Sequence, residues 1–381
     1  MGTSAWSWEI KTSSPERVGS SLGQALSQVR SPAGALVFVS GNLVTELGAL
    51  GTYIASMRLS VPVAVVAGGG VLTERREIED QSAAAGIVWA GGRTELIELS
   101  SGENEDVGES LARLLGDRTG SSSPTVITFL KPDGLGPSAL AALRDLRGTR
   151  HVFGAGTVGD LGAVGIEPGG RLMTGSIAVI LRGLAAPVIR TSHSARLLGP
   201  LRPITSCRGA LLAEIDGQPA LDVLASLGER LAERPLVFVV LAEDSESSTT
   251  EGGRPALIVR GIQGVDPDRR ALVISDEIRE GMRIAFAVRD PRAARDDLEA
   301  VTREIERDIA GAAPRFGVYI DCAGRGTGLY GAHDVDTKIL KARFPGVPFA
   351  GMASSFEVAP HFGRPTMQLY TGVLVLFTSP S

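Results

Sequence analysis

The fold of this chain is decided by residues 35–70, whose sequence is ALVFVSGNLVTELGALGTYIASMRLSVPVAVVAGGG. The stretch begins and ends with an apolar run followed by glycine, and such runs are typical of buried strands. The segment between the runs has the apolar spacing of a helix and extends to about residue 59. A helix that links two buried strands is typical of an α/β layer with parallel strands.

The same order of elements recurs along the chain. In the first copy a helix over residues 15–30 comes before this stretch, and an acidic loop (residues 77–80) and a third short strand follow it. A second copy starts near residue 104 and a third after Pro291. Three units with one order indicate internal duplication. We therefore predict an α/β fold of layered mixed sheets, built from three helix-strand-helix-strand-strand repeats that each end in an antiparallel hairpin.

Residues from about 196 to 290 break this pattern. Their short strands, one helix and Asp-Pro and Gly turns predict a smaller α+β insert. We expect two domains, residues 1–195 with two repeats and residues 196–381 with the insert and the third repeat, which starts at about 291.

Composition narrows the class of protein. The chain has 381 residues, of which 43% are hydrophobic, so it can bury a large core. The net charge of -5, with acids and bases mixed, disfavours a nucleic-acid partner. Cys207 and Cys322 lie too far apart in sequence to suggest a disulfide framework. The sequence shows neither an export signal nor an apolar stretch of roughly 18 residues, so we expect a cytoplasmic protein without a membrane partner.

One short motif connects the chain to a known family. Residues 319–326, YIDCAGRG, resemble the Cys-x-Gly-Arg-Gly turn of the FIST (F-box and intracellular signal transduction) family. Further segments resemble the family in the same order, namely residues 66–80, 204–228, 264–290 and 345–360. The likeness covers nearly the whole chain, as a FIST N domain followed by a FIST C domain. The chain departs from the family at Phe356, where a glycine is usual and implies a backbone angle that phenylalanine tolerates poorly.

The resemblance implies a function as well as a fold. FIST proteins are sensory modules of signal transduction, with small ligands such as amino acids proposed for them, so we expect a binding protein rather than an enzyme. Some members bind haem and sense nitric oxide, which makes haem a candidate cofactor. The first expected helix starts near residue 15, so we expect no fused output domain such as an F-box, a histidine kinase or a cyclase. We expect signalling through a protein partner or through self-association.

The glycine turns at the strand ends form the candidate ligand site. In layered α/β units the loops at the carboxyl ends of strands make the crevice where ligands bind. Three repeats would bring such turns to one shared pocket. The candidate ligand-binding residues are Gly68, Gly69, Gly70, Gly154, Gly156, Cys322, Gly324, Arg325, Gly326, Ser354, Ser355 and Glu357. The alternative is that these glycines only permit tight turns and close packing.

Three side chains in this set carry the expected chemistry. Arg325 is expected to contact an anionic or zwitterionic ligand, because a charge in a glycine turn needs an anion or a carboxylate partner. Glu357 is either that internal partner or the acceptor of a ligand amino group. Cys322 is either a thiolate favoured by Arg325 or a small buried side chain without reactivity.

Other chemistry has weaker support in the sequence. Residues 154–159, GAGTVG, match the dinucleotide fingerprint, but no acid follows between 168 and 213 to bind a ribose. His361 is the best candidate for a haem ligand, with a solvent-facing loop histidine as the alternative. The second function considered is an enzyme of unknown reaction that uses a bound cofactor, or Cys322 with His333 or His361 as base.

Overall fold

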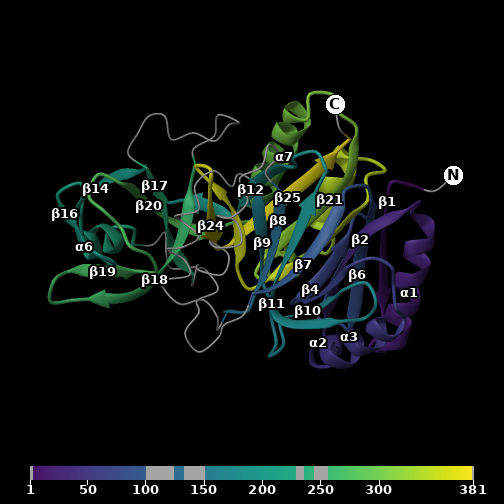
Figure 1. Ribbon diagram of the computed structural model, residues 1–381. Helices are drawn as coiled ribbons and strands as arrows, with labels where there is room; N and C mark the ends of the chain where they lie inside the picture. The colour runs from purple at the N-terminus through teal and green to yellow at the C-terminus, as the bar shows by residue number, and fades with distance from the viewer. Residues whose placement is uncertain (1–2, 100–123, 133–150, 229–235, 244–255, 380–381) are drawn as a thin grey trace. The chain divides into compact units, whose positions relative to one another are not determined.

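The computed structural model describes residues 3–99, 124–132, 151–228, 236–243 and 256–379 (Figure 1). These residues form two compact units. The first unit comprises Met1–Ser192, Leu298–Met367 and Thr371–Ser381, and the second comprises His193–Asp297 and Gln368–Tyr370. None of the described helices is both long and apolar enough to cross a membrane.

Strand pairing in the first unit confirms the threefold repeat. In each repeat the first two strands are parallel, and the third strand runs antiparallel beside the first. The three sets are β2 (Pro32–Ser40), β3 (Val63–Ala67) and β6 (Ala83–Ala90); β8 (Thr125–Leu130), β9 (Val152–Gly156) and β11 (Leu172–Arg182); and β21 (Pro314–Cys322), β22 (Phe349–Ser354) and β25 (Thr371–Thr378). The helices expected in the second copy, near residues 105–117 and 137–148, lie outside the described residues.

The repeats are distributed over two sheets that exchange strands. The larger sheet has the order β1-β6-β2-β3-β10-β11-β8-β9-β23-β24, with β7 paired to β11, and the smaller has the order β12-β25-β21-β22-β4-β5. The strands not yet given are β1 (Ala5–Lys11), β4 (Gly70–Thr73), β5 (Glu77–Glu79), β7 (Arg93–Leu99), β10 (Ala163–Ile166), β12 (Val188–His193), β23 (Glu357–His361) and β24 (Arg364–Gln368). Because β4 of the first repeat pairs with β22, and β23 of the third repeat pairs with β9, loops from different repeats become neighbours.

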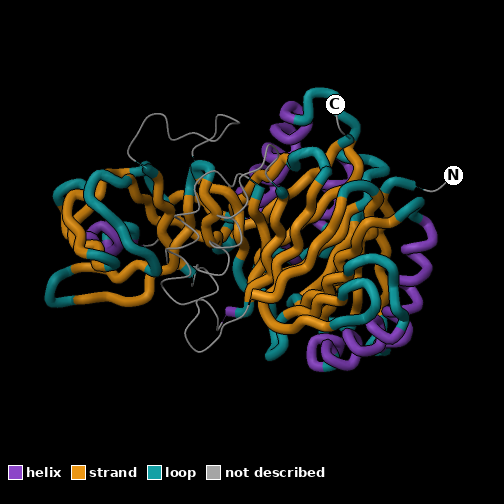
Figure 2. Tube along the Cα trace, in the orientation of Figure 1, coloured by secondary structure: helices purple, strands orange, loops and turns teal. Residues whose placement is uncertain are grey.

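The first unit has four layers, namely two sheets packed face to face and helices on the outer face of each. Alternate side chains of a strand point to its two faces. In β2, Phe38 packs between the two sheets, whereas Val37 faces α1 (Pro15–Gln28) and α3 (Leu47–Ser56). A strand that is buried on both faces has a continuous run of apolar residues, as residues 35–39 of β2 do. Figure 2 shows these helices along one side of the strands.

In the smaller sheet, too, alternate side chains point to the core between the sheets and to the helices. Val318 of β21 joins the core between the sheets, and the adjacent Tyr319 packs with α7 (Pro291–Asp308) and α9 (Val335–Arg343). Phe316 stacks on Trp89 of the other sheet, with ring centroids 5.8 Å apart. Such a pair adds about 0.5–1.5 kcal/mol beyond its buried area.

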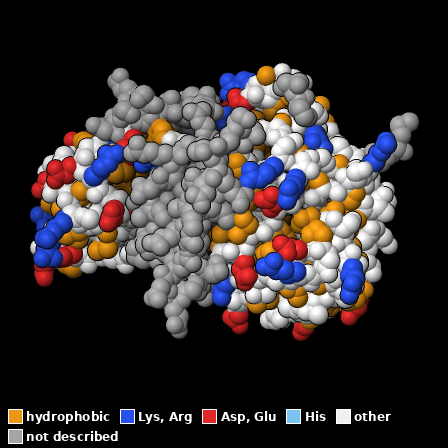
Figure 3. All heavy atoms as spheres, in the orientation of Figure 1, with side chains coloured by type: hydrophobic (Ala, Val, Ile, Leu, Met, Phe, Trp, Pro, Cys, Tyr) orange, Lys and Arg blue, Asp and Glu red, His pale blue; other side chains and the backbone are white. Residues whose placement is uncertain are grey.

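The second unit is a small closed barrel, and its described residues include the helix α6 (Ala220–Ala225) and the first residues of α7. Its strands have the order β13-β20-β14-β15-β19-β18-β17, and β17 also pairs with β20, while β16 (Gln218–Pro219) pairs with β15. The bounds are β13 (Ala195–Leu197), β14 (Arg202–Arg208), β15 (Leu211–Ile215), β17 (Val237–Ala242), β18 (Ile258–Asp266), β19 (Ala271–Ile274) and β20 (Arg283–Arg289). The pairing of β17 with β20 closes the barrel, so β17 is not left as an open edge. The mixed charges of the sequence are visible on the face drawn in Figure 3.

Candidate functional site

One loop of the first unit touches turns from all three repeats. The Gly69 amide donates to the carbonyl of Ala353 at 2.8 Å, and the Ala323 amide donates to the carbonyl of Ser354, also at 2.8 Å. The Ser355 amide donates to the carbonyl of Gly156 at 3.1 Å. The loop after β22 therefore joins the turn after β3, the turn after β9 and the turn after β21.

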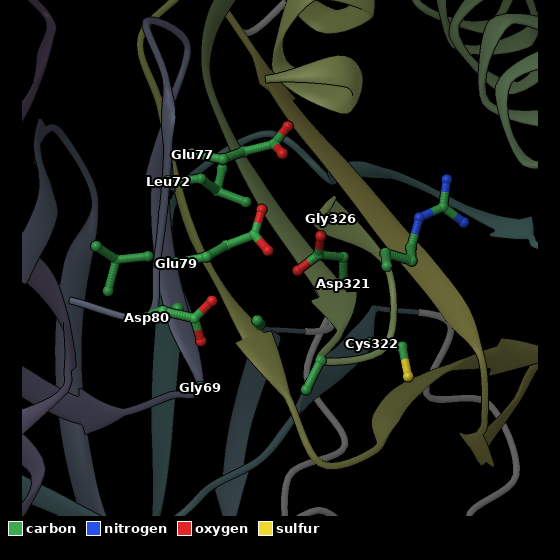
Figure 4. A pocket seen from close by; sticks show the side chains of 13 residues that line it. Gly69, Leu72, Glu77, Glu79, Asp80, Asp321, Cys322 and Gly326 are labelled. Atoms are coloured by element: carbon green, nitrogen blue, oxygen red, sulfur yellow. The ribbon is translucent and has the colours of Figure 1, made fainter. Parts of the chain in front are cut away.

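A small pocket opens where the turns of the first and third repeats meet (Figure 4). Its cavity volume is about 80 Å³, well below the ~300–1,000 Å³ of sites for drug-sized ligands. The lining residues are Gly69, Gly70, Val71, Leu72, Glu77, Glu79, Asp80, Asp321, Cys322, Ala323, Arg325, Gly326 and Ala353. Five candidates from the sequence are thus brought together, namely Gly69, Gly70, Cys322, Arg325 and Gly326. The other seven, namely Gly68, Gly154, Gly156, Gly324, Ser354, Ser355 and Glu357, do not line it.

Close packing explains glycine at two of these seven positions. A Cβ at Gly154 would lie 1.9 Å from the carbonyl oxygen of Thr128. A Cβ at Gly156 would lie 2.3 Å from the ring of Phe356. Phe356 is buried and its φ is not positive, so the usual glycine of the family is replaced here without backbone strain.

Arg325 is the centre of a buried polar cluster. Its Nε donates to Oδ2 of Asp336 at 2.9 Å, and the two side chains are each only 1% exposed. Its remaining nitrogens donate to Oδ1 of Asp336, to the Tyr330 hydroxyl and to the carbonyl of Ser192. Asp336 also accepts from the hydroxyls of Tyr319 at 2.8 Å and Tyr330 at 2.6 Å.

Of the two alternatives for Glu357, an ion pair with Arg325 is therefore not the one the structure has, because Asp336 takes that place. The sequence argument required an anion or a carboxylate partner, and the helix α9 supplies a carboxylate through Asp336. Glu357 instead accepts from the Ser354 hydroxyl at 2.8 Å and from the Thr371 amide at 3.3 Å. Burial raises the pKa of Glu357 to about 8.

Acidic side chains form one wall of the pocket. Glu79 accepts from the Thr327 amide at 3.0 Å and from the Thr327 hydroxyl at 2.6 Å, at the start of α8 (Gly326–Tyr330). Glu77 accepts from the Thr337 amide of α9 at 2.9 Å. Burial, aided by Asp336, raises the pKa of Glu77 to about 7. The edge strand β5 is thus tied through two carboxyl groups to two helices of the third repeat.

Asp321 completes the wall from the strand β21. It is 5% exposed, and its Oδ1 has no hydrogen-bond partner among the described residues. Burial raises the pKa of Asp321 well above its usual range, and the charges of Asp336 and Glu77 add to this effect. Sequence reasoning missed this residue, although an acid within an apolar strand was a visible signal.

Cys322 ends β21 at the pocket and is half-buried. Its Sγ lies 3.5 Å from the Gly324 amide, and neither Cys322 nor Cys207 is in a disulfide. No histidine is among the described residues that line the pocket.

The described residues of this pocket do not suit haem. No histidine lines the pocket in the part of the chain that the structure describes, and the pocket has room for only a few non-hydrogen atoms. The candidate haem ligand His361 ends β23 and packs edge-on against Phe362, with ring centroids 4.6 Å apart.

Comparison with known proteins gives the family. The FIST N domain model matches residues 33–218 and the FIST C domain model matches residues 220–360. A Mycobacterium bovis protein of uncharacterised function is 26% identical over 381 residues, covering 93% of each chain. A Mycobacterium tuberculosis protein, likewise uncharacterised, is 25% identical over 349 residues, covering 85% of this chain and 86% of its own. FIST domains are associated with sensing in signal transduction. The two domain models in tandem span most of the sequence, and the chain belongs to the FIST family.

Proposed function

We propose that this chain is a cytoplasmic sensory module whose pocket at the Cys322 turn binds a small ligand, an amino acid or a similar metabolite. The observation that carries the proposal is the pocket itself, where Gly69 and Gly70 of one repeat face Cys322 and Gly326 of another. Glycines at such a place let a ligand approach the backbone closely. The small volume favours a ligand, or a ligand head group, of only a few non-hydrogen atoms.

In this proposal Arg325 has two roles. It lines the pocket, so it remains a candidate ligand contact. Its ion pair with Asp336 also fixes the turn that carries Cys322 and Gly326, because a fully buried guanidinium is held by its hydrogen bonds.

The signal is proposed to pass through α8 and α9. Glu79 and Glu77 bind the amides of Thr327 and Thr337 at the starts of these helices. A ligand that engages the same carboxyl groups competes with these bonds, so it has different affinities for two arrangements of the helices. Such a difference is what a ligand needs to shift a conformational equilibrium. A protein partner or a second copy of the chain would read the change by contact.

The test is a thermal-shift screen of amino acids and related metabolites, with a variant that fills the pocket. Gly69 is exposed, its φ is not positive, and a Cβ there would lie 3.5 Å from Cβ of Ala323. Gly69→Leu should therefore fold normally and abolish the shift of any ligand that stabilises the parent protein. The matched control is Gly199→Leu, at an exposed glycine whose Cβ would meet nothing within 4 Å.

The thermal-shift results of the two variants distinguish support from refutation of the proposal. Loss of the shift in Gly69→Leu with retention in Gly199→Leu supports the proposal. A screen without any stabilising metabolite, or a ligand that stabilises Gly69→Leu as well as the parent, would refute it.

A further inference from the structure

We infer that the pocket recognises its ligand through a positively charged primary amino group, which Asp321 binds together with Glu77 and Glu79. This inference rests on the proposed function and narrows its ligand class. It makes a cationic group of the ligand the one that is recognised, whereas the glycine turn with Arg325 suggested an anionic or zwitterionic ligand.

The first observation is the unpartnered carboxyl of Asp321. The side chain is 5% exposed, it lines the pocket, and its Oδ1 has no hydrogen-bond partner in the described part of the chain. A buried polar atom without a partner destabilises the fold, so such an atom at a pocket wall indicates a missing donor. Figure 4 shows the carboxyl groups of Asp321 and Glu79 turned toward each other from β21 and β5.

The second observation is the charge of the lining. Four carboxyl side chains line the pocket, those of Glu77, Glu79, Asp80 and Asp321. The guanidinium of Arg325 is the single basic group among the described residues that line the pocket, and it is already paired with Asp336. An anion in this pocket would be repelled by the wall, whereas a cation would offset its charge.

The kind of cation follows from the geometry of the acids. Among the described residues, no group of three or more His, Cys, Asp or Glu is arranged to hold a metal ion. A primary ammonium carries three donors and no acceptor, which matches a wall of carboxyl acceptors with one orphan oxygen. Amino acids and amines carry this group, and their deaminated analogues lack it.

Proton release should accompany binding. The titratable and charged groups around Asp321 include Glu77 and Glu79 of β5, Asp336 of α9, Arg325 of the turn, Glu357 of β23 and the hydroxyls of Tyr319 and Tyr330, and four of these seven are carboxyl groups. Without a ligand, burial and the neighbouring acids favour a proton on this cluster. An arriving ammonium takes the place of that proton, so affinity should rise with pH, by up to about tenfold per pH unit for one proton released. A model ammonium with a pKa near 10 stays charged throughout the range from pH 6 to 8.

The experiment compares matched probes on the full chain. Ethylammonium and L-alanine carry the amino group, whereas propionate and L-lactate are analogues without it. Thermal shift and isothermal titration calorimetry at pH 6, 7 and 8 should show binding by at least one of the first two, stronger at high pH, and none by the last two. Calorimetry in two buffers of different ionisation enthalpy measures the protons released.

Two variants locate the binding group. Asp321→Asn should weaken binding about tenfold or more and reduce the pH dependence, because it removes the carboxylate that accepts from the ammonium. This variant should fold, since the neutral amide replaces a buried acid of almost the same shape. The control is Asp296→Asn on α7, whose side chain is 72% exposed and which should bind as the parent does.

The results separate the inference from the proposed function. Stabilisation by propionate or L-lactate alone would overturn the inference while the ligand pocket stands, provided that Gly69→Leu abolishes it. Stabilisation by Mg²⁺ or Ca²⁺ with no response to either ammonium probe would also overturn it. No binding by ethylammonium and L-alanine would overturn it as well, and the metabolite screen would then decide the proposed function separately.

Discussion

At the scale of single residues, the main contribution of Arg325 is to stability, through its ion pair with Asp336. Its ion pair with Asp336 is buried and is surrounded by the hydroxyls of Tyr319 and Tyr330. Arg325→Met leaves the Asp336 carboxylate buried without its partner, so we expect the free energy of unfolding to fall by about 3–5 kcal/mol. Urea denaturation followed by circular dichroism measures this change.

The control for Arg325 is the double replacement Arg325→Met with Asp336→Leu. Replacing both members of a buried ion pair by apolar side chains is often nearly neutral, so the double variant should recover most of the lost stability. A single variant that lost less than about 1 kcal/mol would contradict the structural role of the pair. Loss of ligand binding in Arg325→Met alone would not identify a ligand contact.

At the scale of elements, the packing of β21 on β22 decides where glycine is required. Gly351 pairs with Tyr319 across these parallel strands, and a Cβ at Gly351 would lie 1.6 Å from the Tyr319 carbonyl oxygen. The clash is with backbone, which cannot move without separating the strands. Gly351→Ala should therefore destabilise the protein by at least about 1–3 kcal/mol, measured as a lower midpoint in urea.

Gly328 provides the matched control for Gly351. It lies in α8, its φ is not positive, and a Cβ there would meet nothing within 4 Å. Gly328→Ala should be neutral or stabilise the protein by up to about 1 kcal/mol, because alanine favours the helix. Equal losses in the two variants would show that the close approach of β22 to β21 is not what excludes a side chain.

At the scale of the whole molecule, buried acids should make stability fall as pH rises. Burial raises the pKa of Glu77 to about 7 and that of Glu357 to about 8. Between the ordinary glutamate pKa and these values the folded protein holds protons that the unfolded chain has released. Each such group therefore contributes stability that is complete below its unfolded pKa and is lost as pH rises through the folded pKa, at about 1.4 kcal/mol per pH unit.

The variant Glu357→Gln isolates one of these groups. The amide keeps an acceptor for the Thr371 amide and does not titrate. Urea denaturation at pH 5, 6, 7 and 8 should show the stability of Glu357→Gln rising relative to the parent with pH. Glu46→Gln, at an exposed carboxylate, should follow the parent. A constant difference between parent and Glu357→Gln across this range would show that Glu357 is ionised throughout.

Much of the fold was predictable because it depends on local patterns. The apolar runs before Gly41 and Gly68 indicate strands buried on both faces, and the helical spacing between them indicates the crossover that makes β2 and β3 parallel. Repetition of this order predicted three equivalent units, and the pairings confirm it. The turn at Cys322 was also visible, because its residues follow a strand directly.

The chemistry of the pocket was less predictable because it depends on contacts between distant residues. Sequence reasoning could require an anion or a carboxylate for Arg325, but it could not identify Asp336 as the partner, because that depends on where α9 packs. It noted the acids of residues 77–80 without assigning them to the site. They reach it only because β4 pairs with β22, across more than 270 positions of sequence.

The sequence by itself determined the order of strands and helices, the repeat and the family, since these follow from apolar periodicity and glycine placement within short windows. Only the tertiary structure decided which charges are paired and which polar atom lacks a donor. The physical reason is that burial and ion pairing are properties of the packed sheets, where residues far apart in the chain share one region of low dielectric constant.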